Sequence, residues 1–133
     1  MSLIKTIEFT ELGDDRGTLI VAEQNKNIPF DIKRAYYLYG MQQDIPRGFH
    51  AHRKCQQVAV CLSGSCDMVM DDGKDKETFT MCSASQGLII DVFQWHEMHN
   101  FSEDCILLVL ASELYDEADY IRDYQTFLSE VAQ

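Results

Sequence analysis

The sequence predicts an all-β fold, a closed sandwich or barrel, that ends in a single α-helix. Most apolar stretches are short, rich in β-branched and aromatic residues, and bounded by turn residues. The last segment instead repeats its apolar residues at helical spacing. Because 133 residues are the length of one ordinary domain and no linker or repeat interrupts them, we expect residues 1–133 to form a single domain.

Nine short strands are expected along the chain, joined by brief connections. The stretches LSGS at 62–65 and DDGKD at 71–75, the latter with Asp-Gly at its centre, predict two hairpin turns. Many short strands with such connections are typical of sandwiches and barrels. The expected strands are residues 4–9, 18–23, 33–39, 57–62, 66–71, 76–81, 87–91, 96–101 and 105–111.

A helix is expected in the C-terminal segment, with Asp116 as its N-cap. Acidic residues near this start are favourable because the positive end of the helix dipole lies there. We expect the apolar stripe of this helix to pack against the barrel or against a second subunit. The stripe consists of Tyr120, Ile121, Tyr124, Phe127, Leu128 and Val131.

Composition excludes several classes of function. A formal charge of -11 repels polyanions, so a nucleic-acid-binding protein is not expected. No apolar run is long enough for a membrane span, and the charged N-terminus does not fit a secretory signal. We therefore expect a cytoplasmic protein. Its five cysteines, an odd number without CxxC pairs, are expected to be reduced core residues.

Basic residues are nevertheless concentrated around two short stretches, which leaves room for a small anionic ligand. Five of the eleven Lys and Arg residues lie there: Lys33, Arg34, Arg47, Arg53 and Lys54. On the first stretch, KRAYYLY, strand alternation places Arg34 and Tyr36 on one face and Tyr37 on the other. Tyr36 is therefore a candidate donor to a developing oxyanion, and Arg34 a candidate anion contact.

The stretch RGFHAHRKCQQVAVCLSGS, residues 47–65, carries the main chemical candidates. In an extended segment His50 and His52 project to the same side, and Gly48 permits a close backbone approach. Paired imidazoles can hold a metal or transfer protons near neutral pH. Gln57 lies an odd number of residues from both histidines, so it faces their cavity only if the chain turns or bulges near residues 53–55.

This stretch resembles the first cupin motif, HxH followed by Glu and then Gly. His50, His52 and Gly64 match, while Gln57 stands where the motif has Glu. The second motif is matched by His96 and Asn100, with Phe93 and Trp95 in place of its usual Pro and Gly. Over residues 40–110 the resemblance implies a small cupin jelly-roll barrel.

The replacement of Glu by Gln bears on whether a metal is expected. A carboxamide offers only a neutral carbonyl where a carboxylate offers a charged oxygen, so the replacement weakens metal binding. Three histidines alone still suffice for zinc in some enzymes. We expect no metal and no other cofactor.

Longer phrases resemble the dTDP-4-keto-6-deoxyglucose 3,4-ketoisomerases over nearly the whole chain. They are DDRGTL, IKRAYYLY, PRGFHAH, VCLSGSC and WHEMHNFSEDCILLVLASELYDEADYIRDY. The resemblance implies a metal-free isomerase, usually a homodimer, that serves deoxyamino-sugar biosynthesis for lipopolysaccharide or other surface glycans. Its substrate would be dTDP-4-keto-6-deoxy-D-glucose. Moving the ketone from C4 to C3 passes through an enediol and needs no redox cofactor or nucleophile.

The same resemblance suggests roles for residues of the site. His50 and His52 are the acid/base candidates, unranked, with Tyr36 close to the sugar. The implied substrate contacts are Gln57 and the arginines Arg34, Arg47 and Arg53, which suit a diphosphate. Arg16 and His96 resemble the subgroup whose 3-keto product has the galacto configuration.

Three alternatives stay open at the level of sequence. A metal-dependent cupin dioxygenase or hydrolase would share the fold. A sugar-nucleotide 3,5-epimerase would exchange the C5 proton as well as the C3 proton. A non-catalytic cupin would bind the nucleotide sugar without turnover.

Overall fold

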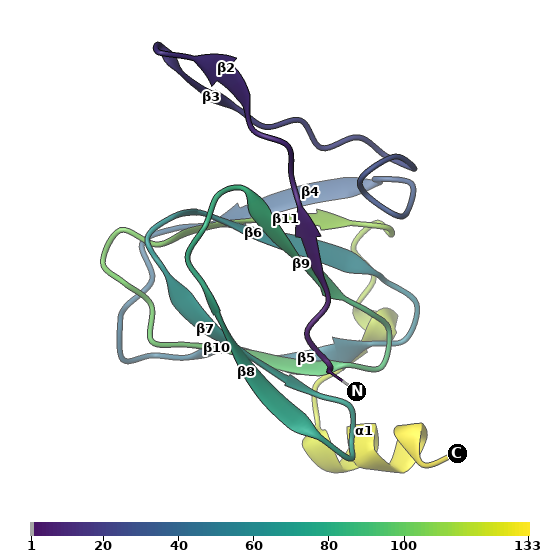
Figure 1. Cartoon of the computed structure of the whole chain (residues 1–133). Coiled ribbons are helices and arrows are strands. Elements are labelled where there is room, and N and C mark those ends of the chain that lie inside the picture. The colour runs from purple at the N-terminus through teal and green to yellow at the C-terminus, as the bar shows by residue number, and fades with distance from the viewer. Residues whose placement is uncertain (1) are drawn as a thin grey trace.

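In the computed structural model, which describes residues 2–133, two five-stranded antiparallel sheets face each other (Figure 1). The first sheet contains, in order, β1 (Thr6–Glu8), β9 (Gln86–Ile90), β6 (Gln57–Ser63), β11 (Ile106–Ala111) and β4 (Arg34–Leu38). The second contains β12 (Tyr120–Ile121), β5 (Arg47–His52), β10 (Trp95–His99), β7 (Cys66–Asp71) and β8 (Lys76–Met81). Within residues 2–133 no strand pair joins the two sheets, so the predicted jelly roll takes the form of an open sandwich.

The inner faces of both sheets form the main core. Alternation along each strand directs every second side chain inward, and the apolar ones among them pack into one cluster. Fully burying a side chain of this size stabilises a fold by about 1.5–3 kcal/mol, so the interior is the main source of stability. The core includes Met68 and Met70 of β7, Leu88 and Ile90 of β9, and Leu107 and Val109 of β11.

The central strand β6 is buried on both faces. Val58 and Val60 point away from the interior, yet both are covered, because Phe9, Ile28 and Phe30 from the N-terminal third of the chain pack over them. The opposite face of β6, which starts with Gln57, is turned toward the second sheet. Gln57 is therefore held in a strand that has little freedom to move.

The predicted C-terminal helix is right only in its second half. Asp116 does act as a cap, but of a short 3-10 helix, η1 (Glu117–Asp119). The α-helix, α1 (Tyr124–Val131), begins after a second cap, Asp123. Between the two caps lies β12, which pairs with the edge of β5.

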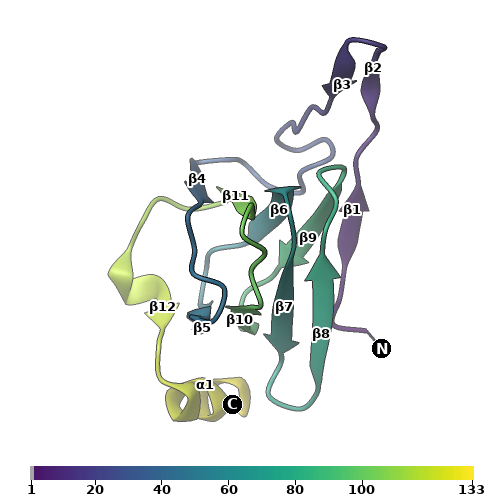
Figure 2. The same ribbon diagram turned by 90° about the vertical axis from the view of Figure 1, so that its left-hand side faces the viewer.

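The predicted apolar stripe packs against the sandwich from Ile121 onward, but its first two residues, Tyr120 and Ile121, belong to β12 and not to the helix. Ile121 and Phe127 are buried with Ala51 of β5 and Trp95 of β10. Figure 2 shows α1 below the second sheet, connected to it through β12. The C-terminal segment thus covers one end of β5, the strand that carries the HxH pair.

A hairpin of β2 (Leu12–Asp14) and β3 (Gly17–Leu19) projects from the sandwich as an arm (Figures 1 and 2). Of the strand expected at 18–23, only residues 18 and 19 are in a sheet, as part of β3. Leu12 and Leu19 are exposed on this arm, as is Arg16 at its turn, which pairs with Asp14. The arm makes no sheet pairing with either main sheet within residues 2–133.

The cysteines are nearly all in the core, as the sequence predicts. All five cysteines are free, and four of them are buried as expected, but Cys82 is exposed. No helix within residues 2–133 has the length and apolar character needed to cross a membrane.

Candidate active site

A cavity of about 360 Å³ lies between the two sheets. Residues from β4, β5, β6 and β10 line it, together with the 115–122 segment. Its wall contains imidazole, phenol, amide and guanidinium groups above an apolar floor, but no carboxylate among the described residues. Of the residues predicted from sequence, those that line it are Arg34, Tyr36, Arg47, His50, Gln57 and His96.

Strand alternation accounts for the β4 contribution. Arg34 and Tyr36 face the cavity, while Tyr37 is 68% exposed on the outer face, as the sequence predicts. The Arg34 guanidinium lies 5.2 Å from the centroid of the Tyr36 ring. Burial raises the pKa of Tyr36 to about 12, so its phenol keeps its proton at neutral pH.

Gln57 reaches the same cavity by the expected change of direction. β5 ends at His52, the chain turns through Arg53 and Lys54, and β6 begins at Gln57 in the opposite sheet. Gln57 therefore faces the histidines despite the odd number of residues between them, because the two strands face each other across the interior. Gln57 is 1% exposed, and its Nε2 donates a hydrogen bond of 2.8 Å to the Tyr36 hydroxyl oxygen.

Three histidines gather on the opposite wall. The ring centroid of His50 lies 5.1 Å from that of His52 and 4.5 Å from that of His96. β5 and β10 approach closely here because residue 48 is glycine with φ +94; a β-carbon would meet the His96 carbonyl oxygen at 3.0 Å. His50 and His96 line the cavity, while His52 is 1% exposed.

Burial keeps these imidazoles neutral. It lowers the pKa of His50 to about 4, with repulsion from His52 adding to the effect, and it lowers the pKa of His96 to about 3. The pKa of His52 is also lowered by burial, although its contact with Asp119 opposes this. Neutral imidazoles with a free lone pair are bases at pH 7.

Asp119 fixes the orientation of His52. Its Oδ2 lies 2.9 Å from His52 Nδ1, and both residues are buried. Burial favours the protonated acid, but hydrogen bonds from His52 and from the Lys54 and Cys55 backbone N–H groups outweigh this and lower the pKa of Asp119. Because an ionised carboxylate only accepts, His52 Nδ1 donates to it, and the lone pair of the neutral ring is left on Nε2.

Tyr115, Tyr120 and Arg122 also line the cavity, and sequence reasoning missed all three. The Tyr120 ring lies 4.4 Å from His52 and 5.0 Å from His50 between centroids. Arg122 stacks over Tyr120 at 4.2 Å and pairs with Glu117. The sequence signal was the second cap, Asp123: had the helix been started there, residues 115–122 would have been free to line a site.

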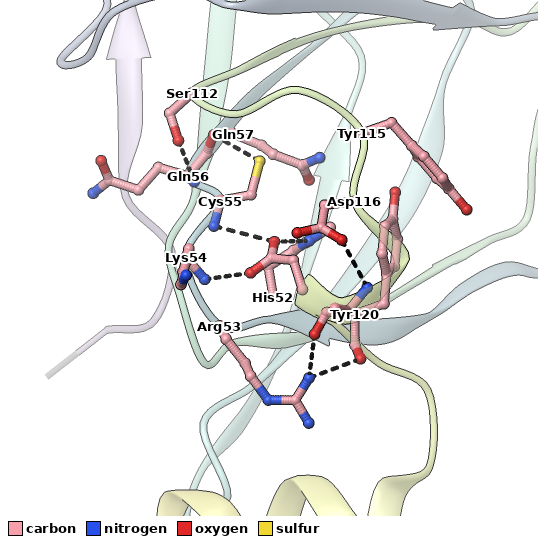
Figure 3. A network of polar contacts seen from close by, with 12 residues as sticks. His52, Arg53, Lys54, Cys55, Gln56, Gln57, Ser112, Tyr115, Asp116 and Tyr120 are labelled. Atoms are coloured by element: carbon pink, nitrogen blue, oxygen red, sulfur yellow. Dashed lines mark hydrogen bonds and ion pairs between the residues drawn. The ribbon is translucent and has the colours of Figure 1, made fainter.

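Besides His52, which does not line the cavity but contacts the His50 ring that does, two predicted residues are not brought to the cavity. Arg16 lies on the projecting arm, paired with Asp14. Arg53 points away, and Figure 3 shows it reaching the backbone of the β12 segment. Its remaining N–H groups form a two-point contact with Glu130 of α1. Arg53 thus binds the C-terminal segment to the end of β5.

The side chains that could act as metal ligands already form hydrogen bonds with one another or with the backbone. His52, Cys55 and Asp119 offer ligand atoms within 4.8 Å of one another. However, Asp119 Oδ1 accepts from Lys54 N, and Oδ2 accepts from His52 and Cys55 N. In the cupin-like set, the amide of Gln57 donates to Tyr36 instead of offering a charged oxygen. These groups fit an acid/base site better than a metal centre.

Buried polar atoms without a partner are concentrated at this site. Within residues 2–133 they are Arg34 Nε, His50 Nδ1 and His52 Nε2. Such atoms cost free energy in a folded protein and are typically retained where function needs them. The cluster therefore combines neutral bases, a protonated phenol and one unpaired guanidinium N–H, that of Arg34 Nε, around one cavity.

Comparison with known proteins gives a consistent result. The family described as "FdtA: WxcM-like, C-terminal" matches residues 2–132. TDP-4-oxo-6-deoxy-alpha-D-glucose-3,4-oxoisomerase from Aneurinibacillus thermoaerophilus is 50% identical over 129 residues, which are 97% of this chain and 93% of that protein.

Two solved structures are similar over nearly their whole length. A 3,4-ketoisomerase from Helicobacter canadensis superposes with a TM-score of 0.96 at 44% identity, covering 100% of both chains. A histidine-to-asparagine mutant of the 3,4-ketoisomerase QdtA from Thermoanaerobacterium thermosaccharolyticum, in complex with TDP-4-keto-6-deoxyglucose, superposes with a TM-score of 0.95 at 40% identity. That match covers 98% of this chain and 95% of the other.

Proposed function

Because this chain belongs to the FdtA-like family, we propose that it is a 3,4-ketoisomerase that moves the keto group of TDP-4-keto-6-deoxy-D-glucose from C4 to C3. The observation that carries the proposal is the composition of the cavity. Two neutral imidazoles, His50 and His96, face a protonated phenol, and arginines flank them without any carboxylate in the described lining. This set suits proton transfer on an anionic sugar nucleotide.

The reaction needs only proton movements. A base removes the proton on C3 while a donor protonates the C4 carbonyl oxygen, which gives an enediol. Loss of the proton on the C3 hydroxyl and delivery of a proton to C4 then produce the 3-keto sugar. Substrate and product have the same atoms and the same oxidation level overall, so no electrons enter or leave.

We assign the C3 base to His50 rather than to His52. Both are neutral at pH 7, but His50 lines the cavity, whereas His52 lies behind it at 1% exposure. The His52 ring is adjacent to the His50 ring, and its Nε2 has no hydrogen-bond partner within residues 2–133. His52 and Asp119 are then suited to accept or return a proton as His50 cycles.

Tyr36 is the proposed donor to the C4 oxygen. Its phenol stays protonated, it lies on the wall opposite the histidines, and its ring is held against the Arg34 guanidinium. A donor aimed at the oxygen where negative charge develops typically contributes about 2.7–4 kcal/mol to the transition state.

The diphosphate is assigned to the guanidinium groups at the cavity. Arg34 has an unpartnered Nε, and Arg47 forms no ion pair within residues 2–133. Arg122 also lines the cavity but is paired with Glu117. Arginine suits this role because its planar fork binds phosphate oxygens in pairs.

The direct test is proton NMR of the purified protein with TDP-4-keto-6-deoxyglucose in deuterated water, without added metal. We expect a 3-keto sugar that carries deuterium at C4. Exchange at C3 and C5 with the ketone still at C4 would instead establish a 3,5-epimerase. Binding without any exchange would favour a non-catalytic protein, and activity that required stoichiometric metal would favour a metal-dependent cupin.

For the product, we propose the galacto configuration at C4, on the basis of Arg16 and His96. His96 lines the cavity next to His50, as this role requires, whereas Arg16 lies outside the cavity of its own chain. The coupling constants of the C4 proton in the same spectra distinguish the two epimers. A double replacement of Arg16 and His96 that left the C4 configuration unchanged would contradict this assignment.

A homodimer would account for the position of Arg16. The arm extends away from the sandwich with Leu12 and Leu19 exposed, and the edge strand β4 exposes Tyr37. In a dimer, an arm of this kind can place Arg16 beside the cavity of the other copy. Light scattering should then give twice the mass of one chain. The cytoplasmic location remains a prediction from the sequence.

A further inference from the structure

Gln57 contacts Tyr36 in the interior between the two sheets. It lies on the inner face of β6 at 1% exposure, and its Nε2 donates 2.8 Å to the Tyr36 hydroxyl oxygen. The strand register explains the contact. Val109 of β11, the strand between β4 and β6, pairs with Tyr36 on one side and Ala59 on the other, so Gln57 lies on the same face as Tyr36, two residues along β6 from the position level with it.

The direction of this hydrogen bond decides where the phenol proton goes. A tyrosine hydroxyl has one hydrogen to donate, and an amide NH₂ accepts none. With Gln57 donating to its oxygen, Tyr36 must direct its own hydrogen elsewhere. Within residues 2–133 Gln57 is its one hydrogen-bond partner, and Tyr36 lines the cavity, so the hydrogen is free for a ligand acceptor there.

We propose that Gln57 is a positioning residue that holds Tyr36 as a hydrogen-bond donor toward the carbonyl oxygen of the substrate. This inference rests on the proposed function and adds a role for the amide. Gln57 acts through Tyr36 and exchanges no proton itself.

The proposal gives a physical reason for an amide at this position. A carboxylate only accepts, so it would draw the Tyr36 hydrogen toward itself and away from the substrate. It would also place a negative charge in a cavity whose described lining has none. The amide both supplies a donor and leaves the field favourable for a diphosphate.

The test compares two replacements of nearly equal size. Gln57→Glu reverses the hydrogen bond, whereas Gln57→Met leaves the Tyr36 hydroxyl without that partner but does not capture its hydrogen. We expect kcat to fall by about 10²-fold in Gln57→Glu and by clearly less in Gln57→Met, with KM changed less than kcat. A role in packing alone would not produce this order.

A double-mutant cycle with Tyr36→Phe identifies the route of the effect. If Gln57 acts through Tyr36, Gln57→Glu should lower kcat about twofold or less once the hydroxyl has been removed. A full additional loss in the Tyr36→Phe background would overturn the proposal. If thermal melting shows that Gln57→Glu does not fold, the same double-mutant cycle can be measured with Gln57→Met.

Two controls complete the design. Gln24→Glu adds the same charge at an exposed site outside the cavity, where the side-chain oxygen can still accept from Ile32 N, and should leave kcat unchanged. Assays with chelator and metal analysis show that a carboxylate at position 57 has not recruited a metal. An inactive wild-type protein would reject the proposed function, whereas an active protein with an additive cycle would reject only the role of Gln57.

Discussion

Among single residues, Asp119 offers the sharpest test of the histidine cluster. It accepts from His52 Nδ1 at 2.9 Å and is itself fixed by two backbone N–H groups. In Asp119→Asn the neutral amide loses the charge that holds the Nδ1–H tautomer. We expect kcat to fall by about 10²-fold or more with little change in KM, measured by the rate of 3-keto sugar formation.

Asp116→Asn provides a matched control on the same segment. Asp116 caps η1 through a hydrogen bond from Ala118 N, and asparagine caps a helix about equally well. Its kcat should equal that of the wild type. Equal losses in both variants would mean that the segment, and not the contact between Asp119 and His52, determines the rate.

Arg47 tests the assignment of the diphosphate. It lines the cavity and has no ion pair within residues 2–133, so its replacement should disturb substrate binding more than folding. We expect Arg47→Met to raise KM and the Kd for TDP by about 10-fold to 100-fold, equivalent to the loss of a charge-assisted hydrogen bond of about 1.5–3 kcal/mol. Titration calorimetry with TDP measures this directly, and an unchanged Kd would exclude Arg47.

Sequence reasoning located the site residues that lie on regular strands. Arg34 and Tyr36 followed from two-residue alternation, and His50 from the HxH spacing, because strand geometry is local. Arg53 was predicted as a substrate contact from its place in a basic cluster. Its partner, Glu130, lies 77 residues further along the chain, and no local pattern shows such a pairing.

Among elements, the C-terminal segment shows why part of the site was missed. Apolar residues at helical spacing fit one helix from Asp116 to Val131, and propensity alone does not separate this from a helix that starts at Asp123. The structure breaks the pattern because β5 has a free edge, and Tyr120 and Ile121 satisfy it by pairing with His52 and Ala51. Tertiary pairing outweighed local periodicity.

Arg53 should therefore matter for stability and not for substrate binding. Its guanidinium joins the end of β5 to Glu130 of α1 and to two carbonyl groups around β12. We expect Arg53→Met to lower the free energy of unfolding by about 1–2 kcal/mol, since the contacts are partly exposed and screened by solvent. Chemical denaturation measures this.

The same variant separates Arg53 from Arg47 in the active enzyme. At a temperature where Arg53→Met is fully folded, its KM should equal that of the wild type. A tenfold rise in KM without a change in stability would return Arg53 to the substrate contacts predicted from sequence.

At the scale of the whole molecule, the buried histidines couple folding to pH. The folded-state pKa of His50 is about 4 and that of His96 about 3, below the ordinary value of 6.5. As pH falls below about 6.5, the unfolded chain therefore binds protons that the folded chain does not. Each such group removes stability by up to about 1.4 kcal/mol per pH unit until its folded pKa is reached.

We therefore expect the free energy of unfolding to decline between pH 6.5 and 5, before the carboxylates contribute. Asp119 has a lowered pKa, so its contribution is lost only below the ordinary carboxyl range. Denaturation at pH 7.5, 6 and 5 measures the decline, and His96→Gln should reduce its slope because one of the titrating groups is removed. An unchanged slope in that variant would contradict the role of His96.

Catalysis should be less sensitive to the same acidification than folding is. If His50 is the base, it stays neutral in the folded protein until the pH approaches about 4, so kcat/KM of folded enzyme should be nearly flat from pH 8 to pH 5. Any activity lost on acidification to pH 5 should then be proportional to the fraction of unfolded protein. It should return when the protein refolds at neutral pH. A kcat/KM profile that fell with an apparent pKa near 6.5 while circular dichroism showed folded protein would mean that a solvated histidine is the base, and the assignment to the buried cluster would fail.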